Sequence, residues 1–159
     1  MTRKHSRISD RIDKRVELEA PIAAVWKALA DAEQFGTWFH LKLQDPFRVG
    51  MTSRGRITYE GLERVQLELL VQEMRPQRLF SYTWHPYAID PRRDYSGEPP
   101  TLVEFRLEPA GRRTRLSISE SGFMGLPHTR SSEAFRMHSQ GWTTQIKNLK
   151  EFLAGKVPA

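Results

Sequence analysis

The chain has 159 residues, 38% hydrophobic and 28% charged, which is typical of one globular domain rather than a fibrous or disordered protein. It contains no cysteine, which excludes disulfides, thiolate metal ligands, iron–sulfur clusters and a cysteine nucleophile. The net charge of +6 would suit a nucleic acid or an anionic membrane. No segment interleaves clustered basic residues with aromatics, so we do not expect nucleic-acid binding.

The sequence lacks any apolar stretch near the roughly 18 residues that span a bilayer. No apolar stretch follows the charged first residues, so no signal peptide is predicted either. We therefore expect a cytoplasmic protein without a membrane span. Within it, we expect residues 1–9 to form a flexible basic tail and residues 10–155 to form one domain.

The first third of the chain predicts a strand and two helices. Alternating apolar and polar side chains over residues 11–19 indicate a half-buried strand, with Lys14 on its apolar face. Apolar residues at helical spacing then predict a helix over residues 21–30, with a proline suited to its first turn. Asp31 can cap a second, short helix, which we expect to end at Gly36.

The rest of the chain predicts strands in series and one long helix. Five segments rich in alternating strand formers are residues 49–60, 64–74, 78–85, 101–108 and 113–121. The loop over residues 86–100 contains four prolines and is long for a hairpin connection, which indicates function or mobility. Ser131 or Ser132 can cap the last helix, whose apolar positions recur every three or four residues to about Leu153.

This order of elements predicts an α+β fold. Consecutive strands joined by short turns favour an antiparallel meander. Such a sheet must bury one face, and the long amphipathic helix is the element available to cover it. The many large side chains on that face should make the sheet curve around the helix.

Four segments of the sequence resemble the START-like (SRPBCC) superfamily, more narrowly the bacterial relatives of the activator of heat-shock-protein-90 ATPase. They are APIAAVWKALADAEQFGTWF (20–39), VQEMRPQRLFSYTW (71–84), TRLSISESGF (114–123) and HSQGWTTQIKNLKEFL (138–153). The resemblance runs from about Ile12 to Leu153. It implies a helix-grip fold, in which a curved antiparallel sheet of about six or seven strands wraps a long C-terminal helix, with two short helices after the first strand.

The resemblance also implies a cavity between sheet and helix that holds a small hydrophobic molecule. The side chains expected to line the cavity are Trp38, Phe39, Tyr59, Tyr82, Trp84, Glu120, Phe123, Met137, His138 and Trp142. Residues 86–100 and the FMGLPH stretch would form its lid or portal. Deleting part of residues 90–98 should then change the rate of ligand exchange and leave the fold standing.

Two polar side chains on apolar strand faces are candidate ligand hooks. Glu120 should point inward with Leu116 and Ile118, at a position where the family often has a histidine. Lys14 shares the apolar face of the first strand, and the family's sheet places that strand beside the last one. A Lys14–Glu120 pair is therefore one interpretation, since a paired inward charge is cheaper than a lone one. The alternative is that both side chains extend to water.

The sequence names no catalytic machinery. It has no H-x-x-x-H or H-E-x-x-H spacing, no G-x-S-x-G elbow and no phosphate-binding loop, so we expect no metal and no cofactor. Binding of a small hydrophobic molecule is the favoured function. One alternative is a cyclase, dehydratase or hydrolase on a hydrophobic or polyketide-like substrate, with acid–base groups from Glu120, His138, Tyr82 and His85. Another is a protein-interaction or co-chaperone-like module.

Two partner assignments stay open at this level. A homodimer is plausible, because short α+β proteins with exposed strand edges often pair, but no residue pattern fixes it. Contact with a chaperone, and a role in stress response, do not follow from the resemblance.

Overall fold

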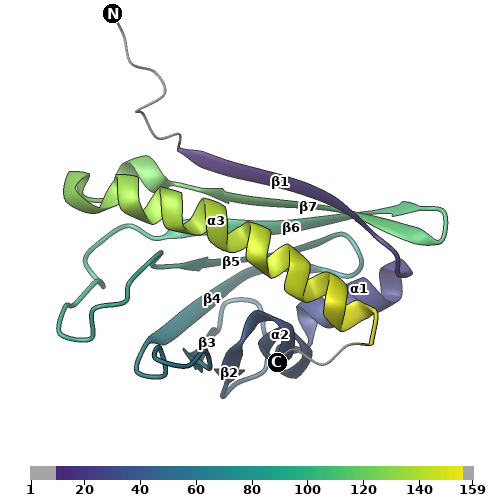
Figure 1. The fold of residues 1–159 in the computed structure, drawn as a ribbon, viewed down its shortest axis with the longest axis horizontal. Coiled ribbons are helices and arrows are strands. Elements are labelled where there is room, and N and C mark those ends of the chain that lie inside the picture. The colour runs from purple at the N-terminus through teal and green to yellow at the C-terminus, as the bar shows by residue number, and fades with distance from the viewer. Residues whose placement is uncertain (1–9, 156–159) are drawn as a thin grey trace, which may run out of the picture.

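The computed structural model describes residues 10–155. It contains one seven-stranded antiparallel sheet, with the strand order β1-β7-β6-β5-β4-β3-β2 (Figure 1). The strands are β1 (Arg11–Leu18), β2 (Leu41–Leu43), β3 (Thr52–Ile57), β4 (Gln66–Arg75), β5 (Leu79–Trp84), β6 (Thr101–Ala110) and β7 (Arg113–Ser121). The helices are α1 (Ile22–Ala30), α2 (Ala32–Phe39), the 3-10 turn η2 (Phe123–Gly125) and α3 (His128–Leu153). The predicted α+β helix-grip fold is confirmed. The predicted tail, residues 1–9, lies outside the described residues.

Helix α3 crosses the inner face of the sheet, with α1 and α2 near its C-terminal end (Figure 1). Its buried residues include Trp142 and Leu149, and burying each such side chain stabilises the fold by about 1.5–3 kcal/mol. The facing core is aromatic: Phe35 of α2 lies with its ring centroid 6.1 Å from that of Phe80 and 6.2 Å from that of Phe105. The core thus joins α2 to the middle of the sheet. No helix within residues 10–155 is long and apolar enough to cross a bilayer.

The second helix does not end at Gly36 as the sequence predicts. It continues to Phe39, and His40 closes it in the left-handed region with φ 66°. A Cβ on Gly36 would lie 2.3 Å from the carbonyl oxygen of Leu41. The glycine therefore lets α2 pack directly against β2, a short edge strand that the sequence pattern did not indicate.

The last helix also begins earlier than predicted. The backbone amides of Arg130 and Ser131 donate to the carbonyl oxygen of Pro127, at 2.8 and 3.0 Å. Pro127 is the N-cap residue, so the first helical residue is His128. The serines expected to cap this helix lie inside its first turns, and Arg130 consequently joins the face that packs on the protein.

Candidate functional site

The buried carboxylate of Glu120 is the centre of a polar network between the sheet and α3. Its side chain is 0% exposed and accepts four hydrogen bonds. Oε2 accepts from Trp84 Nε1 at 2.8 Å and from Thr101 Oγ1 at 2.5 Å. Oε1 accepts from His138 Nδ1 at 2.7 Å and from Trp142 Nε1 at 2.9 Å. We call these five residues the Glu120 network.

Strand register and helix periodicity bring this network together. On the sheet, Glu120 pairs with Val103, and Thr101 begins the same strand opposite Trp84. Residues two apart in a strand share a face, so Thr101 lies diagonally beside the carboxylate. On α3, the two network residues are four positions apart and therefore occupy one helix face. The same alternation that puts Leu116 and Ile118 inward makes Glu120 the last inward residue of β7.

The donors around Glu120 favour its ionised form. Burial raises the pKa of this carboxyl, but the positive charge that His138 carries in its protonated form, together with the hydrogen bonds from His138, Thr101 and Trp84, outweighs burial and leaves the pKa below its ordinary value. An indole N–H can only donate, so the two tryptophans require an acceptor. Glu120 is accordingly a carboxylate at neutral pH. Its four hydrogen bonds come from two indole N–H groups, one hydroxyl group and one imidazole ring.

His138 is held in one tautomer by its two partners. Its Nδ1 faces the carboxylate of Glu120, and its Nε2 accepts the backbone N–H of Tyr87 at 3.1 Å. An acceptor nitrogen carries no proton, so the hydrogen-bond pattern assigns the proton to Nδ1 and makes the ring neutral. A neutral imidazole backed by a carboxylate has the parts of a general base. Within residues 10–155, however, the partner of Nε2 is a backbone amide rather than a nucleophilic side chain.

An apolar cavity of about 260 Å³ lies beside this network. Its walls come from the middle of α3, from the ends of β3 and β4 with their connecting turn, and from the loop segment 87–89. Along α3, Met137, Gly141 and Gln145 form one row at a spacing of four residues. Gly141 leaves this wall open, because a Cβ at this position would meet no atom within 4 Å.

The structure brings six of the ten expected lining residues to this cavity: Phe39, Tyr59, Trp84, Met137, His138 and Trp142. The other four lie elsewhere in the interior. Trp38 is 1% exposed and donates from Nε1 to the carbonyl oxygen of Ala28 at 2.8 Å. Phe123 packs against Phe135 near the start of α3. Glu120 and Tyr82 are fully buried behind the cavity wall.

The proposed pairing of Lys14 with Glu120 is wrong. The strands β1 and β7 are neighbours as expected, but their register sets Lys14 opposite Ile118 and Ile12 opposite Glu120. The carboxylate takes all its donors from other elements. Lys14 is half-buried, and within residues 10–155 it forms no ion pair with Glu120.

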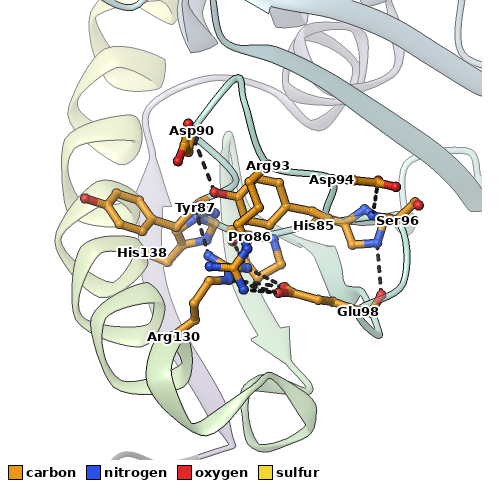
Figure 2. Close-up of polar contacts among 11 residues, drawn as sticks. His85, Pro86, Tyr87, Asp90, Arg93, Asp94, Ser96, Glu98, Arg130 and His138 are labelled. Atoms are coloured by element: carbon orange, nitrogen blue, oxygen red, sulfur yellow. Dashed lines mark hydrogen bonds and ion pairs between the residues drawn. The ribbon is translucent and has the colours of Figure 1, made fainter.

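Sequence reasoning missed the anchor of the proline-rich loop, residues 86–100. Figure 2 shows Arg130 of α3 and Glu98 of the loop pointing toward one another. Arg130 Nη2 lies 2.7 Å from Glu98 Oε1, and Nη1 and Nη2 donate to the carbonyl oxygens of Tyr87 and Pro86 at 2.9 and 3.0 Å. The guanidinium also covers the ring of Tyr95 at 4.6 Å. The loop is therefore fastened to the helix at its two ends.

One feature of the sequence could have pointed to a residue that sequence reasoning missed at the cavity. Gly141 interrupts a helical pattern, where a glycine lowers helix stability by about 1 kcal/mol relative to alanine and so calls for a packing or functional reason. The sequence around Arg130 gives no comparable indication, because a single arginine beside a loop is typical of a solvent-exposed position. Its role depends on contacts 32 and 44 residues away in the chain.

The hydroxyl of Tyr82 is buried without a hydrogen-bond partner among residues 10–155. Burial, and then the charge of Glu120, raise its pKa well above the usual value, so it keeps its proton.

Tyr82→Phe should therefore raise the free energy of unfolding, by about 1 kcal/mol, because an unsatisfied buried group is removed. Urea denaturation measures this. Tyr59→Phe, which removes a hydroxyl that accepts from Asn148, is the control and should not stabilise. A loss above about 1 kcal/mol in Tyr82→Phe would show that water or another group satisfies the hydroxyl.

A second recess, of about 560 Å³, lies between α2 and β2. Polar groups line much of it, including the carboxylates of Asp31, Glu33 and Asp45. Asp31 is occupied in capping α2. This recess is larger but does not suit an apolar ligand. In the described part of the chain, no three histidine or acidic side chains are grouped to hold a metal ion.

A curved sheet gripping one long helix defines the START-like class of proteins. The chain belongs to the family described as Activator of Hsp90 ATPase homolog 1-like protein, which matches residues 19–154. No curated protein matches the chain at a significant level.

Solved structures with low sequence identity share the fold. Protein MLL2253 from Mesorhizobium loti is 22% identical with a TM-score of 0.72, over 91% of this chain and 97% of that one. DynU16, a protein in the dynemicin biosynthetic locus, is 20% identical with a TM-score of 0.70, over 94% of this chain and 49% of that one. The Aha1 dimer from Colwellia psychrerythraea is 16% identical with a TM-score of 0.66, over 90% and 95%.

Proposed function

We propose that this protein binds one small, mostly apolar molecule in the cavity between α3 and the sheet. The observation that carries the proposal is the apolar cavity of about 260 Å³, opened by a glycine in the middle of a long helix. An engineered apolar cavity of about 150 Å³ holds a benzene molecule, so this one has room for a ligand of about two rings. Ligand sites are typically concave and apolar with few polar groups.

The walls of the cavity support this function. Trp84 and Trp142 border the cavity with ring centroids 6.1 Å apart, while their N–H groups are turned to Glu120. The network thereby satisfies the polar tips and leaves only apolar parts of the two rings for contact with a ligand. The loop segment 87–89 forms part of the wall and is the place where a ligand would enter, since it belongs to no helix or strand.

The relatives are consistent with this proposal at the level of the fold. DynU16 has the same architecture and lies in a biosynthetic locus, a setting in which a small-molecule site has a use. The homodimer and the chaperone contact stay predictions, and the Colwellia dimer is the reason to test the first of them by sedimentation.

Two substitutions at Gly141 test the cavity directly. Gly141→Ala should stabilise the protein by about 0.5–1 kcal/mol, because alanine favours the helix and its Cβ meets open space. Gly141→Leu should fold equally well but fill the cavity, and affinity for methoxynaphthalene measured by calorimetry should fall at least about tenfold, or about 1.4 kcal/mol. Alanine is the matched control and should retain binding. Equal binding by the leucine variant and the wild type would contradict the proposal.

A further inference from the structure

The three histidines that border the cavity differ in what their ring nitrogens can offer a ligand. His85 Nε2 lies 3.0 Å from the carbonyl oxygen of Glu98, so the loop occupies it. His40 stacks on Tyr59 at the rim, with ring centroids 4.1 Å apart. His138 lies where the cavity meets the Glu120 network, and its side chain is 16% exposed. Among the three, only His138 has its protonation pattern fixed from behind by a buried carboxylate.

That fixed pattern makes His138 Nε2 a strong acceptor. Its other nitrogen is committed as a donor to Glu120, which has no exposed surface and is held by three further donors. A negative charge behind the ring pushes electron density toward Nε2, and in an apolar setting such chains of hydrogen bonds strengthen one another. A ligand group meeting this nitrogen must therefore bring a proton to donate.

The present donor to Nε2 can be exchanged for a ligand. It is the backbone N–H of Tyr87, at 3.1 Å, within the proline-rich loop. Tyr87 has φ 51°, in the left-handed region that bulky residues seldom adopt. The Tyr87 N–H and the Pro86 carbonyl belong to one planar peptide unit, so releasing this amide and relaxing that backbone also loosens the Arg130 bond to Pro86, while Arg130 stays paired with Glu98. Figure 2 draws this contact between Tyr87 and His138 as a dashed line.

We propose that His138 selects apolar ligands that carry one weakly acidic hydroxyl group, such as a phenol or an enol, which donates to Nε2 in place of the Tyr87 amide. The proposal rests on the binding function argued above and adds the chemical class of the ligand. Glu120 acts as a positioning residue, since it touches His138 and not the ligand. The sequence analysis proposed Glu120 as the polar group that contacts the ligand. In this proposal His138 makes that contact, and Glu120 orients its imidazole ring.

Naphthol and methoxynaphthalene form the matched pair of probes, because the second carries a methyl group in place of the hydroxyl hydrogen and so cannot donate a hydrogen bond. Calorimetry on the wild-type protein should show naphthol binding at least about tenfold more tightly. His138→Asn keeps a side-chain N–H near the position of Nδ1, for Glu120, and removes the acceptor at Nε2. In this variant the preference for naphthol should fall to less than about twofold. His128→Asn, at an exposed position at the start of α3 that does not line the cavity, is the control and should keep the full preference.

Each result decides between the two proposals. If neither probe binds to the wild type, the cavity is not a ligand site, and both proposals fail. If both probes bind equally, the cavity binds ligands but the selection by His138 is refuted. A preference that survives in His138→Asn, or disappears in His128→Asn, would show that His138 is not the selecting acceptor and would also refute this proposal.

A measurement on the wild type alone covers the case in which His138→Asn does not fold. Saturating naphthol should speed hydrogen exchange of the Tyr87 amide at least about tenfold, because that amide loses its acceptor. Methoxynaphthalene should leave this exchange rate unchanged. Equal rates with both probes would overturn the proposed exchange of donors.

Discussion

Replacing Glu120 by leucine is expected to cost about 3–5 kcal/mol of the free energy of unfolding, because a buried acceptor of four hydrogen bonds is lost. The leucine side chain fills similar space but leaves two indole N–H groups, one hydroxyl and one imidazole N–H without an acceptor. Each unsatisfied buried donor costs about 1–3 kcal/mol, though the contributions do not add fully. Urea denaturation followed by far-ultraviolet circular dichroism measures the loss.

The glutamine variant separates hydrogen bonding from charge. A glutamine amide accepts on its oxygen side but presents its own N–H groups on the other, where Trp84 can only donate. We expect Glu120→Gln to lose about 1–3 kcal/mol. Glu108→Gln on the exposed surface is the control and should stay within about 0.5 kcal/mol. A loss below about 1 kcal/mol in the leucine variant would show that water or rearranged side chains satisfy the donors.

We also expect the stability difference between the wild type and Glu120→Gln to depend on pH. The pKa of Glu120 is lower in the folded protein than its ordinary value, so its ionised form is stabilised by folding. This contribution is present above the unfolded pKa, about 4.3, and is lost as the pH falls through the lower folded pKa. From about pH 6 to about pH 3 the wild type should therefore lose more stability than Glu120→Gln, and the gap between them should narrow. A gap that widens in acid would contradict the sign.

Replacing Arg130 by methionine is expected to release the proline-rich loop. The change removes the bonds to Glu98, Pro86 and Tyr87 and leaves the 10%-exposed carboxylate of Glu98 with Arg93 alone. Removing one partner of a buried ion pair typically lowers the free energy of unfolding by about 3–5 kcal/mol. Because Glu98 keeps its contact with Arg93, we expect a loss of about 3 kcal/mol here. Because the lost contacts all hold one loop, most of the effect should be local.

Limited trypsin digestion measures this release. Cleavage after Arg92 or Arg93 should speed up at least about tenfold in Arg130→Met, since proteolysis follows the population of the opened loop. Arg136→Met, an exposed position on the same helix, is the control and should not change the rate. Arg130→Lys keeps the charge but loses the planar fork, so its rate should lie between the two. Unchanged cleavage in Arg130→Met would show that the loop is held by other contacts.

Most of the fold follows from periodicity in the sequence. Strict alternation located β1, β4, β6 and β7, and the apolar stripe of the last helix identified the element that covers the sheet. The failures are places where a tertiary contact overrode the local signal. Gly36 reads as a helix stop, yet it serves the close approach of Leu41. The helix α3 starts at a proline N-cap rather than at the serines.

The site was less predictable because its parts come from distant segments. Alternation alone placed Glu120 inward, but its partners Trp84 and Trp142 lie 36 and 22 residues away in sequence. Only the register of β1 against β7 shows that Lys14 faces Ile118 instead. The width of the cavity likewise depends on how side chains pack. The sequence shows a glycine at position 141, but only the structure shows that the space beside it is open.

The most direct test of the proposed function is the indole region of a nitrogen-15 NMR spectrum during titration with methoxynaphthalene. The chain has four tryptophans, of which Trp84 and Trp142 border the cavity. Trp38 donates to Ala28 in the core, away from the cavity, and provides the internal control. We predict that the signals of Trp84 and Trp142 shift together and saturate, while that of Trp38 stays in place. A spectrum in which neither cavity signal moves, or in which all four move alike, would contradict the proposal that this cavity binds a ligand.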